Sequence, residues 1–268
     1  MNLQNNKNNK KNKISLILLT KNETENIKTN FSWLKNCNSI NELIVIDDNS
    51  TDNTVKQINN LKSEKIKVKV FKRTLNNNFS TQRTFAIKKS SNNWILWLDA
   101  DEKPTTKLIN FLDNFTFPNN IHSFSFKRLD FFLEKKLKHG ETNNLNFVRL
   151  FNKNHGKFIG KVHETWQNTG TNQKTKLIIT HNPHKNLKSL IKKINFYTNI
   201  RSKELFNQKV KTNLFQIIFY PLAKFIQNYF FRFGFLDSNQ GIIIALSMSL
   251  HSFLVRAKLW HLWQQQSH

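Results

Sequence analysis

Short apolar runs alternate with helix-like spacing over the first half of the chain. Runs of strand length stand at 14–19, 43–46, 68–71 and 94–98. Apolar residues three or four positions apart predict helices at 27–34, 55–61 and 79–87. Pro104 suits the first turn of a further helix. Strands that alternate with helices, and that are apolar throughout, indicate an α/β fold with a mostly parallel, Rossmann-like sheet covered on both faces.

From residue 186 onward the alternation stops, and longer helical patterns replace it at 187–194, 214–236 and 241–263. Pro221 is expected to kink or restart the second of these. Lys, Arg and Trp residues flank the apolar stripes, and no run of 18 uninterrupted apolar residues occurs, so a conventional spanning helix is not expected. The pattern predicts helices that lie on an anionic membrane surface, or that pack on the sheet or on a second subunit.

These patterns divide the chain into three parts. Residues 1–13 are rich in Asn and Lys without an apolar core, which predicts a disordered basic tail and not a secretory signal. Residues 14–184 form the α/β domain, and residues 185–268 form a C-terminal helical extension. The single cysteine, Cys37, excludes an intrachain disulfide framework.

Acidic residues cluster directly after two of the predicted strands, at the edge of the sheet where such folds bind ligands. Asp99 and Asp101 stand two residues apart, so in extended geometry both project to one side and suit a hard divalent cation, Mg²⁺ or Mn²⁺. Asp47 follows the second strand and could accept a hydrogen bond from a ribose hydroxyl or a base N–H. The alternative for both clusters is a solvated turn with helix N-caps.

The net charge is +25, from 42 Lys and Arg against 17 Asp and Glu, and by itself it indicates a nucleic-acid-binding protein. However, the 40 Asn residues show a compositional bias that also enriches Lys, and acids at strand ends would repel nucleic-acid phosphates. The first strand–helix turn, Leu19–Glu23, lacks the glycine-rich loops of dehydrogenases and P-loop nucleotidases. An acidic metal pair without such a loop favours nucleotide-sugar transferases, with no nucleic-acid partner.

Four motifs stand out in the first half of the chain: ILLTKNE (17–23), ELIVIDDNSTDNT (42–54), FSTQRTFAI (79–87) and WILWLDADE (94–102). Together they resemble glycosyltransferase family two, of the GT-A fold. The second half resembles the bacterial lipopolysaccharide core-biosynthesis branch in KHG (138–140), VRLFNK (148–153), GKVHE (160–164), TH (180–181) and FGFLDSNQG (233–241). Residues 14–184 would then be the GT-A catalytic domain.

The resemblance implies a binding site for a nucleotide-sugar donor. Thr20, Glu23 and Asp47 would hold the nucleoside. Gln82 and Arg83 would face the nucleotide, with the Arg83 guanidinium against the diphosphate and Asp99 beside it. The loop at 141–142 departs from the glycine and tryptophan frequent in relatives, so it leaves the identity of the sugar open.

The resemblance also implies the metal site and the catalytic base. Asp101 would be the stronger metal ligand of the acidic pair, and His181 would approach the metal or the diphosphate. Glu164 would be the general base, with His163 as a positioning residue. The alternatives are an exposed strand position for Glu164 and a structural histidine for His181.

The resemblance implies an inverting, metal-dependent hexosyltransferase that acts at the inner face of the cytoplasmic membrane. As members of the resembled branch do, it would transfer a sugar, typically glucose from UDP-glucose, to an inner-core acceptor of lipopolysaccharide or lipooligosaccharide such as heptose. Three alternatives remain: a family-two transferase with a polyprenyl-phosphate, capsule or protein acceptor; an inactive scaffold; and, most remote, a nucleic-acid-binding protein.

Overall fold

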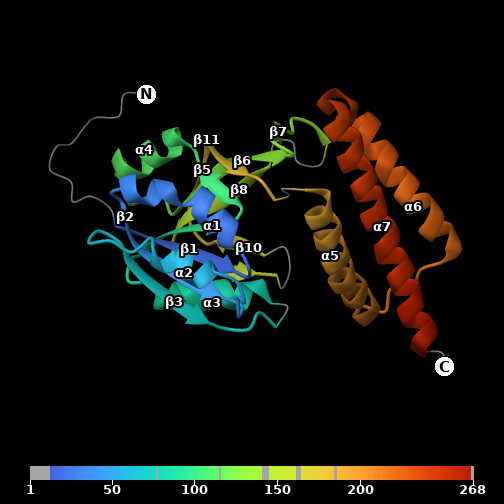
Figure 1. Cartoon of the computed structure of the whole chain (residues 1–268), viewed down its shortest axis with the longest axis horizontal. Helices are drawn as coiled ribbons and strands as arrows, with labels where there is room; N and C mark the ends of the chain where they lie inside the picture. The colour runs from blue at the N-terminus through green and yellow to red at the C-terminus, as the bar shows by residue number, and fades with distance from the viewer. Residues whose placement is uncertain are drawn as a thin grey trace. The chain divides into compact units, whose positions relative to one another are not determined.

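The computed structural model describes residues 13–76, 78–114, 116–140, 145–160, 164–183 and 186–266 (Figure 1). Nearly all of the expected basic tail, together with His163 and the 141–142 loop, lies outside these residues. The described chain forms two compact units. The first comprises residues 13–128 and 146–181, and the second comprises residues 129–145 and 182–266.

Four parallel strands form one half of the sheet in the first unit, in the order β3-β2-β1-β4. They are β1 (Ile14–Thr20), β2 (Ile40–Asp47), β3 (Lys67–Lys72) and β4 (Trp94–Asp99). Each contains one of the apolar runs, so the predicted strands and the α/β class are confirmed. The strands belong to two separate core clusters, with Leu16 and Leu18 in one and Ile17 in the other. Both faces of the parallel sheet are therefore buried, as the apolar strands predict.

The sheet continues beyond β4 in the order β4-β8-β6-β11-β5. Within this half, β8 is antiparallel to both β4 and β6, and β5 is antiparallel to β11. These strands are β5 (Glu102–Pro104), β6 (Ser123–Phe132), β8 (Asn146–Asn152) and β11 (Asn172–His181). A separate hairpin contains β9 (Gly156–Ile159) and β10 (Thr165–Asn168), and β7 (Lys135–Lys136) pairs with the end of β6. The sequence pattern does not predict this second half of the sheet.

The helices of the first unit are α1 (Thr24–Asn30), the 3₁₀ helix η1 (Ser32–Asn36), α2 (Thr54–Asn59), α3 (Phe79–Lys89) and α4 (Thr106–Asn114). The continuous helix expected over 27–34 is wrong, because the chain changes to a 3₁₀ turn at Ser32. The helical placement of Pro104 is also wrong. Pro104 ends β5 opposite Ile179, and α4 begins two residues later.

The second unit contains α5 (Leu187–Asn207), α6 (Leu214–Ile226), a π-helical turn η3 (Gln227–Phe231), a 3₁₀ turn η4 (Gly234–Asp237) and α7 (Ser238–Gln266). Helix α7 packs against both α5 and α6. The expected restart at Pro221 is wrong: α6 continues through it, and the Pro221 carbonyl accepts a hydrogen bond from Ser249 Oγ at 2.8 Å. The break between helices lies instead at 227–237.

By length and composition alone, residues 234–266 are apolar enough to cross a membrane, with a mean hydropathy of 1.5 in their most apolar 18-residue window. No spanning helix is expected from the sequence, because that expectation requires 18 uninterrupted apolar residues and this segment has no such run. However, the interruptions in this helix are mainly uncharged Ser, Gln and His, and only Arg256 and Lys258 are charged within α7. Core helices of soluble proteins can pass the same test.

Candidate active site

The register of the parallel strands brings the two acidic clusters to one edge of the sheet. Thr20 pairs with Asp47 on β2, and the preceding residue Leu19 pairs with Asp99 on β4. The two carboxylates therefore end strands on either side of β1. This placement agrees with the expectation from the sequence that both clusters lie at the carboxyl edge.

Asp47 is completely buried at the end of β2. Its carboxylate accepts hydrogen bonds from Thr20 Oγ1 (3.0 Å), the Ser50 amide (2.8 Å) and Ser50 Oγ (2.5 Å). These bonds fix the turn after β2 to the end of β1. Asp47 therefore stabilises a turn, which was the alternative expected for its cluster. A ligand that binds at this corner would meet a turn that these hydrogen bonds already hold in place.

Glu23 lies at the start of α1, beside the same turn. Its carboxylate accepts a hydrogen bond from Asn26 Nδ2 (2.6 Å), and its backbone N–H donates to Thr54 Oγ1 (2.7 Å). Thr20, Glu23 and Asp47 are therefore brought to one corner of the edge, between the ends of β1 and β2 and the helices that follow.

Gln82 is almost fully buried on α3, and its contacts are with the chain itself. Its amide donates to the carbonyls of Arg73 (3.0 Å) and Thr74 (2.7 Å), and its Oε1 accepts from Arg73 Nη1 at 2.5 Å. Gln82 therefore holds the loop that follows β3. The geometry supports a positioning role for Gln82 more directly than a contact with the nucleotide.

A single guanidinium joins the second acidic cluster to the expected base. Arg83 Nη2 donates to Asp99 Oδ1 at 2.7 Å, and Arg83 Nε donates to Glu164 Oε1 at 2.6 Å. The Arg83 side chain is only 3% exposed, and that of Glu164 is 10% exposed. Glu164 directly precedes β10, and the structure brings it to the sheet edge.

Arg149, on β8, forms the other half of this network. Its Nη2 donates to Asp99 Oδ2 (3.1 Å) and to Glu102 Oε1 (2.5 Å). The guanidinium groups of Arg149 and Arg83 lie 3.7 and 3.9 Å from the centroid of the Trp97 ring. The indole, with its own N–H donated to the Val148 carbonyl, is a rigid cation–π platform for both cations.

The charges and the burial in this network shift the pKa values of two of its carboxyl groups, Asp99 and Glu102. Burial by itself raises the pKa of Asp99, but the positive charges of Arg83 and Arg149 outweigh it and lower that pKa to about 2. Burial raises the pKa of Glu102, against the opposing effect of Arg149. Asp99 is therefore ionised at neutral pH, and both of its oxygens accept arginine N–H groups.

Asp101 and His181 form a second pair beside this network. His181 Nε2 lies 3.6 Å from Asp101 Oδ1, and the two side chains are 14% and 11% exposed. The extended geometry expected from Asp99 to Asp101 is not found, because β4 ends at Asp99 and the chain turns at Ala100 and Asp101.

The donor set at Asp101 and His181 fits a divalent cation. A carboxylate oxygen and an imidazole nitrogen are both suitable ligands, and a cation in such a site completes its coordination with water and phosphate oxygens. Within the residues that the structure describes, no three His, Cys, Asp or Glu side chains are grouped to hold a metal by themselves. The pair therefore matches a metal that is held jointly by protein and substrate.

Three residues of this site are missing from the sequence-based expectations: Trp97, Glu102 and Arg149. Trp97 and Glu102 lie within the motif at 94–102, and Arg149 lies within the motif at 148–153. For Arg149, the signal that could have found it is a charged residue inside the otherwise apolar run 147–151, because charged residues are rarely buried unless they are paired. Glu102 carries no such signal, because it follows two other acids.

The parallel half-sheet with acids at its carboxyl edge, followed by C-terminal helices, is the architecture of glycosyltransferases of the GT-A fold. The chain is similar to the mannosyltransferase PcManGT from Pyrobaculum calidifontis, whose structure contains GDP-Man and Mn²⁺. The two share a TM-score of 0.52 at 11% identity, over 94% of this chain and 88% of that one.

The chain belongs to glycosyl transferase family 2, whose family model matches residues 15–185. It is 26% identical to the uncharacterized glycosyltransferase RP128 of Rickettsia prowazekii, and 27% identical to an uncharacterized glycosyltransferase of Rickettsia bellii. Each match covers 92% of this chain and 86% of the relative. The protein is thus an enzyme that transfers a sugar.

Proposed function

We propose that this enzyme is an inverting glycosyltransferase that moves glucose from UDP-glucose to an inner-core heptose of lipopolysaccharide or lipooligosaccharide. The observation that carries the catalytic part is the Arg83 guanidinium, which binds Asp99 and Glu164 at once. It fixes the base of the reaction relative to the acidic edge of the sheet. The acceptor class rests on the second-half motifs, at 138–140 and 233–241 among others.

The donor is proposed to bind along the carboxyl edge. Thr20, Glu23 and Asp47 form the nucleoside corner, and the turn that Asp47 fixes gives this corner a defined shape before the donor arrives. Gln82 supports the adjoining loop through Arg73. Preorganisation of this kind limits the ordering cost of binding.

A divalent cation, Mg²⁺ or Mn²⁺, is proposed to be held by Asp101 and His181 together with the donor diphosphate. When bound, it supplies positive charge next to the leaving group. Asp99 also belongs to the acidic pair, but its two hydrogen-bonded oxygens favour a role in orienting Arg83 and Arg149. The same fold accommodates GDP-Man and Mn²⁺ in PcManGT.

The chemical step is a displacement at the anomeric carbon of the donor sugar. Glu164 accepts the proton of the acceptor hydroxyl while the hydroxyl oxygen forms its bond to the anomeric carbon. The bond from that carbon to the diphosphate oxygen breaks on the opposite face, and the nucleoside diphosphate leaves with the electron pair. Arg83 holds Glu164 in place and contributes positive charge to the edge.

The proposal is tested by transfer of labelled glucose from UDP-glucose to purified lipooligosaccharide whose inner-core heptose lacks that glucose. We expect transfer in the presence of Mn²⁺ or Mg²⁺ and its loss with a chelator. Transfer to a polyprenyl phosphate, capsule fragment or protein instead, with none to the lipooligosaccharide, would contradict the proposed acceptor and leave the enzyme class intact.

The acceptor is lipid-linked, and the second unit is proposed to bring the enzyme to the inner face of the cytoplasmic membrane. Leu214 is 71% exposed and Phe231 is 76% exposed, and further large apolar side chains of α6 and the following turns are also exposed. Residues 186–266 contain eleven Lys and Arg but only two acids, Glu204 and Asp237. An anionic bilayer matches both the apolar surface and this charge, whereas a second copy of the chain would repeat the same charge.

Flotation with vesicles tests this docking. We expect the protein to float with phosphatidylglycerol-containing vesicles at physiological salt, and to float several-fold less with phosphatidylcholine alone, because basic residues near an anionic surface each contribute about 1 kcal/mol. The double variant Leu214→Ser, Phe231→Ser should lose most of the binding. Ile159→Ser, the same kind of apolar-to-polar change at an exposed residue of the first unit, should not. No flotation of the unaltered protein would contradict the proposed docking.

A further inference from the structure

Helix α3 presents one buried face and one outer face. Its buried face carries Gln82 and Arg83 toward the sheet edge. Its outer face carries Thr81, Thr84, Phe85 and Lys88, which recur at the spacing of one helical face. A cavity of about 510 Å³ lies along this outer face. Its size falls within the usual range for small-molecule sites.

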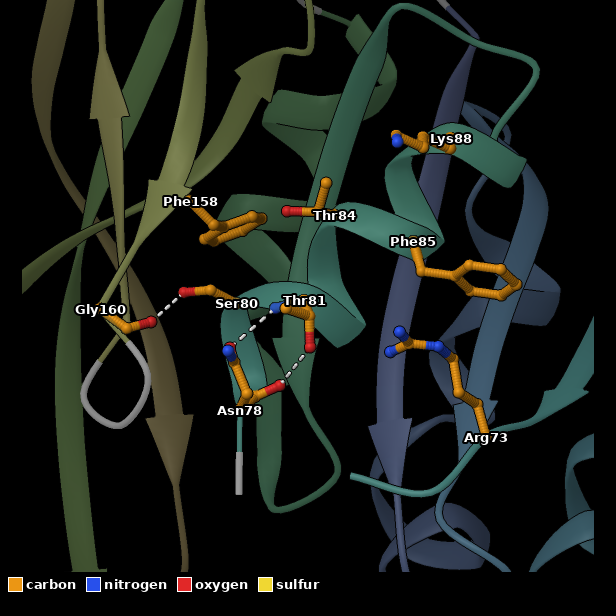
Figure 2. A pocket seen from close by; sticks show the side chains of 9 residues that line it. All are labelled: Arg73, Asn78, Ser80, Thr81, Thr84, Phe85, Lys88, Phe158 and Gly160. Atoms are coloured by element: carbon orange, nitrogen blue, oxygen red, sulfur yellow. Dashed lines mark hydrogen bonds between the residues drawn. The ribbon is translucent and has the colours of Figure 1, made fainter. Parts of the chain in front are cut away.

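The walls of this cavity come from three parts of the first unit. Figure 2 shows Phe158 and Gly160, from the β9 hairpin, on one side of α3, and Arg73, from the loop after β3, on the other. Asn78 and Ser80 line the end nearest the start of the helix. A hydrogen bond from Ser80 Oγ to the Gly160 carbonyl joins α3 to the hairpin there.

The charged residues that line the cavity are all cations. Arg73 and Lys88 are positively charged, and none of the nine lining residues is acidic. Arg73 is held in place, because its guanidinium lies 5.2 Å from the centroid of the Phe85 ring and also bonds to Gln82. The other polar groups are the hydroxyls of Ser80, Thr81 and Thr84 and the amide of Asn78.

This combination selects an anionic saccharide. Figure 2 shows Lys88 and Arg73 at opposite ends of the cavity, so each can pair separately with a phosphate or carboxylate. The hydroxyl and amide groups match sugar hydroxyls, and the partly exposed Phe85 ring can contact the apolar face of a sugar. A free phosphate would use the cations but not the remainder of the lining. A neutral sugar would leave the cations without a counter-charge.

The position of the cavity indicates which substrate this is. Gly160, in the cavity wall, is four residues before Glu164, and Glu164 bonds to Arg83 on the buried face of the same helix. We infer that the outer face of α3 binds an anionic sugar of the acceptor, next to the sugar whose hydroxyl Glu164 deprotonates. This inference rests on the proposed function and adds an acceptor subsite to it.

Steady-state kinetics with the lipooligosaccharide acceptor test the subsite in the full chain. Lys88→Glu should raise the KM for the acceptor about tenfold, the effect of losing one charge-assisted contact, with kcat and the KM for UDP-glucose nearly unchanged. Lys62→Glu makes the same charge change at an exposed position outside the cavity and should change none of these values. Equal effects of the two variants, or no effect of Lys88→Glu, would overturn the subsite while the transfer activity itself stands.

Direct binding gives a second, activity-independent test. Glucose 6-phosphate, glucose, inorganic phosphate and UDP are titrated separately into ¹⁵N-labelled protein, and the amide signals of Thr81, Thr84 and Gly160 are followed. We expect glucose 6-phosphate to shift them and Lys88→Glu to weaken this binding about tenfold. Equal shifts with glucose or with phosphate would overturn the anionic-saccharide assignment. Shifts with UDP alone would assign the cavity to the donor.

Discussion

Replacement of Arg149 by methionine is expected to destabilise the first unit by about 3–5 kcal/mol, the usual consequence of removing one partner of a buried ion pair. Arg149 is 4% exposed and binds both Asp99 and Glu102, and Glu102 has no exposed side-chain surface. Without the guanidinium, the buried Glu102 carboxylate would lose its ion-pair partner, whereas Asp99, whose side chain is 36% exposed, would keep its bond to Arg83. Burial already raises the pKa of Glu102, and the variant should raise it further.

Urea unfolding followed by circular dichroism measures this effect, with Arg201→Met as the matched control. Arg201 pairs with Glu204 at 2.6 Å, but both side chains are about half exposed, so its loss should change stability by less than about 1 kcal/mol. Adding Glu102→Gln to Arg149→Met should recover part of the loss. A change below 1 kcal/mol for Arg149→Met would contradict the role given to the network.

The variant Glu164→Gln is expected to lower the rate of sugar transfer by about 10²–10⁴-fold, the range for removal of a general base. Glutamine keeps an oxygen that can accept the Arg83 Nε–H, so the local geometry and donor binding should persist. Glu64→Gln, at an exposed position in the same unit, is the control.

Transfer kinetics and donor binding by calorimetry separate the possible results. Near-normal turnover of Glu164→Gln would show that Glu164 is not the base. If the variant loses both donor affinity and turnover, Glu164 acts by positioning Arg83, because loss of the ion pair would explain both effects. A loss of kcat alone is the predicted result.

The parallel half of the fold follows from the sequence because its signals are local. Each apolar run is a strand, and each acidic cluster follows a strand, so the common edge of Asp47 and Asp99 could be predicted before any pairing was known. The second half of the sheet, from β8 to β5, depends on contacts between distant segments. Pro104 illustrates this: a local preference for the first turn of a helix is overridden by the pairing of β5 with β11.

The same distinction separates the predicted and the missed parts of the site. Glu102 reads as one more acid in a solvated cluster, and only the approach of Arg149 from β8 makes its burial tolerable. The link from Arg83 to Glu164 joins residues 81 positions apart, so no spacing rule could reveal it. The resemblance supplies candidate residues, and the structure shows how they contact one another.

The structure shows where the basic residues behind the net charge of +25 lie. The excess of +25 is not concentrated at the catalytic edge, where four acids and two arginines meet around Trp97 and His181. In the described part of the chain, the basic residues of the second unit accompany exposed apolar side chains. Arg73 and Lys88, in the first unit, line the cavity on α3.

The most direct test of the account is transfer of labelled glucose from UDP-glucose to lipooligosaccharide that lacks its inner-core glucose, with and without Mn²⁺. The account predicts a labelled product with inverted anomeric configuration, formed only with the divalent cation and lost in Glu164→Gln. No transfer from UDP-glucose to this acceptor under any of these conditions would contradict it.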